Sequence, residues 1–95
     1  MPDYAIRVEL RGNPTADEYQ TLHSLMGRKG FAQTIAGVDR SGNRRHFSLP
    51  HAVYYGSSPS DCAVVRDSIL GAVKAEVQQD VIVFAVQAET WSLGS

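Results

Sequence analysis

Residues 4–18, YAIRVELRGNPTADE, contain the signals that decide the fold. Apolar and polar residues alternate at the start of this stretch, which predicts a strand with one face against a core. Gly12 and Pro14 then end the strand in a turn. Thr15 and Glu18 form a T-x-x-E capping box, in which each side chain accepts a hydrogen bond from a backbone N–H at the start of a helix. The chain is therefore expected to open with a strand followed by a helix.

The first helix is expected to end near Lys29. Apolar residues recur before it at three- and four-residue spacing, and Gly30 supplies a stop signal that follows two cations. Residues 31–38 then read as a second strand. The segment 39–43, which is rich in turn-forming residues, reads as the turn of a hairpin.

Pro50 complicates the return strand of this hairpin, which lies within residues 46–55. Proline has no backbone N–H to donate to a sheet ladder, so Pro50 either begins the strand or marks a bulge. The first alternative is favoured, and it gives a strand at 52–55.

A second helix start follows, with Ser58 as the capping residue, Pro59 at the first helical position and Asp61 at the third. An apolar stripe at helical spacing then predicts a helix to about Gln78. Residues 81–86, VIVFAV, are β-rich and apolar on both faces, which predicts the last strand.

The order β-α-β-β-α-β predicts one ferredoxin-like α+β domain over residues 1–95. Its sandwich has a four-stranded antiparallel sheet with two helices on one face, and a short tail at 89–95. The last strand is an edge of such a sheet. Because that strand is apolar on both sides, either a second copy pairs with it in a homodimer or the tail, including Trp91, covers it. The homodimer is favoured.

The composition fits a folded domain, with 43% hydrophobic and 20% charged residues. The longest apolar run, 81–88, is shorter than the ~18–20 residues that span a bilayer, so no membrane association is expected. The first residues lack the pattern of a signal peptide, and Cys62 has no partner for an internal disulfide. The cytoplasm is therefore the expected compartment.

Basic residues are unevenly placed: residues 28–46 include five lysines and arginines against one acid, although the net charge is −1. In the expected topology the first strand ends where the hairpin lies, so Arg11 is expected beside the hairpin arginines. These are Arg40, Arg44 and Arg45. Guanidinium groups bind phosphate oxygens, so the patch predicts weak, salt-sensitive binding of RNA or DNA. The alternative is a solvated loop.

His23 is the candidate catalytic residue. It lies on or beside the apolar face of the first helix, four residues after Tyr19. There it either packs half-buried or acts as a general base or acid near neutral pH. The histidines and the lone cysteine do not have metal-ligand spacing, so no metal and no cofactor are expected.

A set of short motifs is familiar once these elements are placed. The motifs are Arg7-Val8-Glu9-Leu10, Tyr19 with Leu22-His23 and Met26, Gly30-Phe31 with Thr34-Ile35, Leu49-Pro50 with Ala52 and Tyr54, and Trp91. Together they resemble the GhoS-type family of antitoxins from type V toxin-antitoxin systems. The resemblance covers most of the chain.

The resemblance implies a ferredoxin-like fold and an endoribonuclease that cleaves the messenger RNA of a membrane-damaging toxin. It places the basic position of the first helix at His23. The strand-one aspartate that similar CRISPR adaptation nucleases use for metal is not matched, because Glu9 is the only acid inside that strand. Cleavage without metal would use the RNA's own 2′-hydroxyl, with His23 as base and an arginine stabilising the phosphorane charge.

A second hypothesis involves no chemistry. The apolar last strand is also typical of a non-catalytic, homodimeric protein-interaction module, such as one from a mobile element. A third, small-molecule binding on the open sheet face, is supported only by analogy with the fold.

Overall fold

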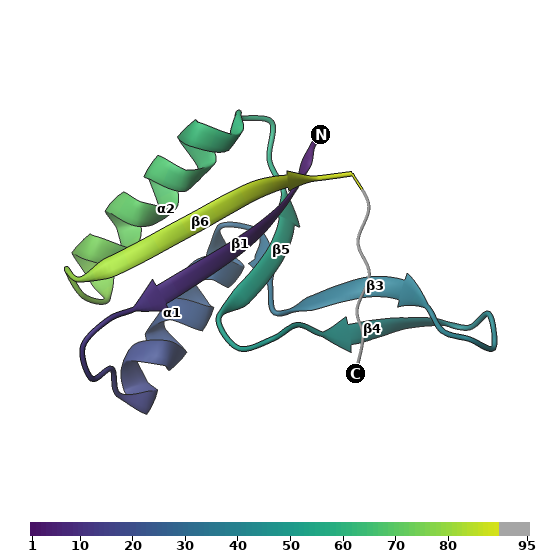
Figure 1. Cartoon of the computed structure of the whole chain (residues 1–95), viewed down its shortest axis with the longest axis horizontal. Helices are drawn as coiled ribbons and strands as arrows, with labels where there is room; N and C mark the ends of the chain where they lie inside the picture. The colour runs from purple at the N-terminus through teal and green to yellow at the C-terminus, as the bar shows by residue number, and fades with distance from the viewer. Residues whose placement is uncertain (90–95) are drawn as a thin grey trace.

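The computed structural model describes residues 1–89, which form six strands and two helices (Figure 1). In chain order these are β1 (Asp3–Leu10), α1 (Ala16–Arg28), β2 (Phe31–Ala32), β3 (Thr34–Val38), β4 (Arg44–Ser48), β5 (Val53–Ser57), α2 (Cys62–Glu76) and β6 (Val81–Ala88).

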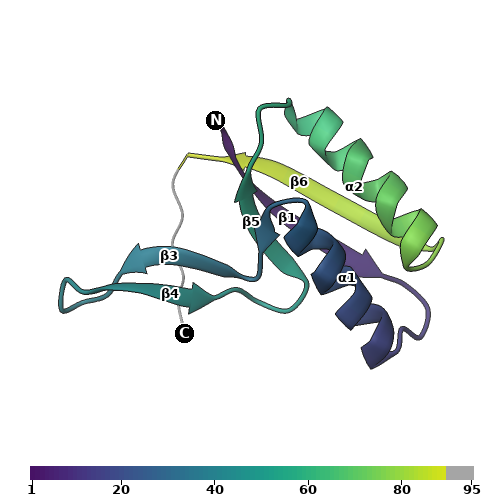
Figure 2. The same ribbon diagram turned by 180° about the vertical axis from the view of Figure 1, so that it is seen from behind.

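Four of the strands form an antiparallel sheet in the order β2-β5-β1-β6. Both helices cover the same face of this sheet, as the front and back views show (Figures 1 and 2). The remaining strands, β3 and β4, form a separate two-stranded sheet that projects away from the body. The predicted α+β class, with two helices on a four-stranded antiparallel sheet, is confirmed.

The core lies between the sheet and the helices. Alternate residues of β1 face it, and each is at most 4% exposed: Tyr4, Ile6, Val8 and Leu10. They pack against buried residues of both helices: Leu22, Leu25 and Met26 from α1, and Val65, Ile69 and Val73 from α2. Each such burial stabilises the fold by ~1.5–3 kcal/mol, so the alternation in β1 fixes which face the helices cover.

The first helix begins where its sequence predicts. The Oγ1 atom of Thr15 accepts from the backbone N–H of Glu18 at 3.1 Å, and the Glu18 carboxylate accepts from the Thr15 N–H at 3.1 Å. The predicted capping box is therefore present, and the helix ends at Arg28 with Lys29 as its C-cap.

The second helix begins three residues later than predicted. Asp61 is its N-cap, with Oδ1 accepting from the Val64 N–H at 3.0 Å. Ser58 instead accepts a hydrogen bond from the backbone N–H of Ser60, which forms a local turn before the helix. The prediction of Ser58 as the cap was wrong because both residues offer a capping oxygen and the turn occupies that of Ser58.

The predicted second strand is divided. Only β2 pairs with the main sheet, and the chain then bends at Gln33, whose carbonyl accepts from the Leu49 N–H at 2.8 Å. Residues 34–38 pair with β4 instead. The return strand of the main sheet is β5, which begins at Val53 and extends to Ser57. Pro50 precedes it in a turn, so the ladder of β5 cannot continue back toward the hairpin.

Among residues 1–89, strand β6 is an edge of the sheet, since the strand hydrogen-bonded to it is β1 alone. Its residues Ile82, Phe84 and Val86 are 47%, 65% and 44% exposed. The predicted covering tail with Trp91 lies outside the described residues. Within residues 1–89, neither helix has the length and apolar character needed to cross a membrane.

Gly56 of β5 provides a test of this packing. A Cβ atom there would lie 2.2 Å from the backbone oxygen of Gly30 and 2.8 Å from a ring carbon of Phe31. Gly56→Ala should therefore lower the free energy of unfolding by about 1–3 kcal/mol or more, measured by urea denaturation. Gly27→Ala is the matched control, because its Cβ enters open space in α1. It should raise stability by about 0.5–1 kcal/mol. Equal midpoints for the two variants would contradict the close approach of β2 to β5.

Candidate functional site

Two histidines and two tyrosines gather at one side of the core. Tyr19 and His23 come from α1, His51 comes from the turn before β5, and Tyr54 comes from β5 itself. The rings contact one another in a chain: the centroids of Tyr19 and His51 are 4.5 Å apart, and those of His23 and Tyr54 are 5.8 Å apart. We call these four residues the His–Tyr cluster.

The position of His23 is set by the buried phenol of Tyr54. Tyr54 lies opposite Ile6 in the sheet, faces the helices and is fully buried. A buried hydroxyl requires a hydrogen-bond partner. His23 supplies it, with 2.7 Å between its Nδ1 atom and the phenol oxygen. In the tautomer with its proton on Nδ1, His23 donates to the phenol oxygen, and Nε2 then has the lone pair that can accept a proton.

His51 is held by a strained turn. The N–H of Val53 donates to the carbonyl of Pro50 at 3.1 Å, and Ala52, which follows His51 inside this turn, has a φ of 60°. Alanine in this left-handed region costs on the order of 1–3 kcal/mol, so surrounding contacts must impose it. One such contact is the 3.0 Å bond from the Val8 N–H to the Ala52 carbonyl. The turn thus places the ring of His51 against the ring of Tyr19 on α1.

The two imidazoles face each other edge to face. Their centroids are 6.4 Å apart and their planes are perpendicular. Burial, and then the like charge of His51, lower the pKa of His23 below its ordinary value. Burial likewise raises the pKa of Tyr54, so the phenol keeps its proton. His23 is therefore a neutral imidazole near pH 7, the form that accepts a proton.

The hairpin presents its three arginines to solvent. Arg44 and Arg45 lie on β4, Arg40 lies in the turn, and all three are exposed. Within residues 1–89 no carboxylate pairs with them, because the nearby Asp39 accepts from the backbone N–H groups of Ser41 and Asn43. We call these three residues the arginine arm.

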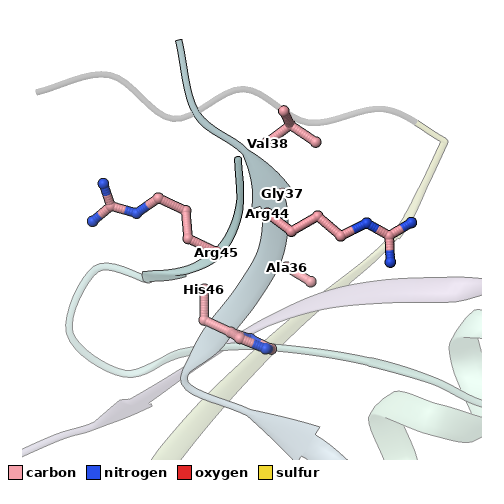
Figure 3. A pocket seen from close by; sticks show the side chains of 6 residues that line it. All are labelled: Ala36, Gly37, Val38, Arg44, Arg45 and His46. Carbon is pink, nitrogen blue, oxygen red and sulfur yellow. The ribbon is translucent and has the colours of Figure 1, made fainter. Parts of the chain in front are cut away.

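The arm also has a hollow surface. A depression of about 530 Å³ is lined by six hairpin residues: Ala36, Gly37, Val38, Arg44, Arg45 and His46. The side chains of Arg44 and Arg45 extend to different sides of the hairpin (Figure 3), as neighbours in a strand do. The Arg45 guanidinium lies 5.0 Å from the ring centre of Phe47. This cation–π contact orients one guanidinium and leaves its N–H edge available to an anion.

Arg11 does not join the arginine arm, contrary to expectation. It follows β1, where its N–H donates to the Asp80 carbonyl and its guanidinium lies 3.8 Å from Glu9. The end of β1 and the tip of the hairpin lie at opposite ends of the longest axis of the molecule (Figures 1 and 2). The expectation failed because the chain leaves the sheet after β2, which directs the hairpin away from the end of β1.

Sequence reasoning identified His23 but not His51 or the phenol of Tyr54 as its partners. Pro50 signalled a turn, yet the contact of His51 with α1 depends on the positive φ of Ala52, which alanine does not announce. Among the described residues, no three His, Cys, Asp or Glu side chains gather as a set of metal ligands.

The comparisons with known proteins give no relative on which to base a function: the chain matches no family model and no curated protein. Five residues of the short motifs named in the sequence lie together in space. Tyr19, His23, Pro50, Ala52 and Tyr54 all belong to the His–Tyr cluster or to the turn that holds it. The chemistry of this cluster therefore has to be argued from its own geometry.

The titration of His23 tests the cluster. Its pKa should lie below the ~6.5 of an unperturbed histidine, measured from the imidazole proton shifts by NMR. The unfolded chain then binds this proton at a higher pH than the folded chain. The contribution of the lowered His23 pKa to the free energy of unfolding is fully present above pH ~6.5 and is lost as the pH falls toward that pKa.

His51→Gln should move the pKa of His23 part of the way back, because burial, the larger cause, remains. A pKa of His23 at or above ~6.5 in the wild-type protein would contradict the buried, neutral imidazole.

Proposed function

We propose that the chain binds RNA and cleaves its backbone, as the endoribonuclease antitoxins of the GhoS type do. The observation that carries the proposal is the placement of the His23 imidazole, held at Nδ1 by Tyr54 and faced by His51. A positioned histidine that accepts a proton is what attack by a 2′-hydroxyl requires.

The arrangement of the main sheet is compatible with this proposal. We infer a ferredoxin-like topology, in which the β3–β4 hairpin is an insertion between the second and third strands of the main sheet. The order β2-β5-β1-β6 puts β1 and β5 side by side at the centre of the sheet. Helix α1 follows β1 and leads to β2 at one edge, and helix α2 follows β5 and leads to β6 at the other. This fold hosts many functions, so the function is argued from the site.

The arginine arm serves as the binding element in this proposal. Seven residues separate Arg44 from His51, so at ~3.3 Å per residue the two lie at most ~23 Å apart. An RNA strand of several nucleotides that reaches the His–Tyr cluster can therefore also contact the arm. The rings of the cluster have no hydrogen bond or ring contact with an arginine within residues 1–89. The arginines are accordingly assigned to phosphate binding.

RNA cleavage is the direct test. Purified protein incubated with labelled single-stranded RNA at low salt, with EDTA present, should cut it and leave a 2′,3′-cyclic phosphate. His23→Gln should reduce the rate ~10²–10⁴-fold, because the proton acceptor is lost. Arg44→Ala should leave the chemistry intact, weaken binding at all sequences and reduce the salt slope of log K by about 1.

Arg66→Ala is the matched control for the arm, because Arg66 is an exposed arginine paired with Asp67 on α2. It should change neither binding nor its salt slope. No cleavage and no salt-dependent retention of RNA by the wild-type protein would refute the proposed function.

A homodimeric interaction module is the second candidate, and β6 favours it. The strand is an edge of eight residues with no charged side chain, no proline and a row of three exposed apolar residues. Natural edge strands usually carry charged residues or proline, which hinder pairing with another chain, and β6 has neither. Antiparallel pairing with a second copy would satisfy the free backbone groups and bring no like charges together.

Phe84→Lys should weaken this association at least tenfold, about 1.4 kcal/mol, measured by light scattering across a concentration series. Val38→Lys is the matched control, since Val38 is 63% exposed against 65% for Phe84 but lies on the hairpin. It should leave the dimer intact. A wild-type protein that stays monomeric at the highest concentration would rule out the module.

A further inference from the structure

We infer that His51 is the second proton-transfer group of the site, the general acid that protonates the leaving oxygen while His23 acts as base. This inference rests on the proposed function and adds a residue to it. The resemblance does not supply the role. It comes from the placement of His51 across from His23 by a separate element of the fold.

The spacing of the two rings suits a phosphodiester that lies across the pair and contacts both. Their centroids are 6.4 Å apart with perpendicular planes, so the edge of one ring is directed toward the other. A substrate enclosed between the ring edges would not have space for a hydrogen bond of about 2.8 Å on each side, so the phosphodiester would instead form one such bond with each ring from the same side of the pair. One imidazole can thus reach the attacking 2′-oxygen while the other reaches the leaving 5′-oxygen, the in-line requirement of the reaction.

The turn holds the backbone of His51 in place before substrate binds. The Pro50–Val53 hydrogen bond and the Ala52–Val8 hydrogen bond fix the backbone on either side of it. The Tyr19 ring at 4.5 Å restricts its imidazole. His51 is nevertheless exposed, so its ring can bind substrate and exchange protons with water. Strain of the kind stored at Ala52 is typical of groups held for function.

With the Nδ1–H of His23 donating to the Tyr54 oxygen, the Nε2 atom takes the proton of the 2′-hydroxyl, and the bond between O2′ and phosphorus forms. The bond between phosphorus and O5′ breaks, and O5′ takes a proton from the imidazolium of His51. The products are a 2′,3′-cyclic phosphate and a 5′-hydroxyl. His23 leaves the step protonated and His51 neutral, and exchange with water restores both.

Among the described residues, the ring contacts of the two histidines are with each other and with the two tyrosines of the cluster. His23 is faced by Tyr19 on its own helix, by His51 in the turn and by Tyr54 of β5, and His51 is faced by Tyr19 and His23. Cleavage that needs one neutral and one protonated imidazole gives a bell-shaped pH profile. Loss of His51 should remove the alkaline fall of this profile, and loss of His23 the acidic one.

A sulfur leaving group separates the two roles. A dinucleotide with sulfur in place of the 5′-bridging oxygen leaves as a thiolate, whose pKa of ~8.5 makes protonation unnecessary. We expect His51→Ala to cut the ordinary oxygen substrate at least ~10²-fold more slowly than wild type, and the sulfur substrate within about threefold of wild type. His23→Ala should be slow on both substrates, since both need the 2′-hydroxyl deprotonated.

His51→Gln provides a second variant with a polar side chain at the turn, and circular dichroism confirms the fold of each. Ser24→Ala is the matched control, an exposed neighbour of His23 on α1, and should match wild type on both substrates. Wild-type rates for His51→Ala on the oxygen substrate, or equal losses on the two substrates, would overturn the role of His51 alone. No cleavage of either substrate by the wild-type protein would overturn the proposed function as well.

Discussion

The buried phenol of Tyr54 is the constraint on which the site depends. The alternation of β5 places its ring beside the apolar face of β1, where the helices exclude water. An unsatisfied hydroxyl in that position would cost ~1–3 kcal/mol, so a partner from α1 is required. His23 meets this need through the 2.7 Å bond at Nδ1. The hydrogen bond that joins α1 to β5 therefore also orients the His23 imidazole at the edge of the core. One contact thus serves both the stability of the fold and the proposed chemistry.

The turn at Ala52 is a second constraint with two consequences. Its positive φ directs His51 toward α1, and its carbonyl bonds to β1 so that β5 begins in register. The turn also separates β5 from β4, since the ladder of the main sheet cannot pass back through Pro50. Residues 34–38 are then left without a partner in that sheet and pair with β4. The turn at Ala52 thus positions His51 and also separates the β3–β4 hairpin, which carries the arginine arm, from the main sheet.

Local signals in the sequence were sufficient for most of the fold. The alternation of β1 and the Thr15–Glu18 capping box specify their elements through contacts within a few residues, and both were predicted. The division of the second strand was not, because it depends on where β5 begins, some 20 residues away along the chain. His51 was missed for the same reason. Its partners are on α1, and the turn that brings them together needs a conformation that alanine rarely adopts.

The three candidate surfaces lie on different parts of the fold, which decides how they can work together. The order β2-β5-β1-β6 puts β5, with Tyr54 and the turn of His51, on one side of β1 and the free edge of β6 on the other. A second copy on β6 would leave both the His–Tyr cluster and the arginine arm open. The exposed side chains of β6 are apolar and carry no charge to attract phosphate, whereas the arm carries three cations without carboxylate partners within residues 1–89. A polyanion would therefore be drawn to the hairpin and away from β6, so the two proposals, RNA binding and self-association, are compatible on one chain.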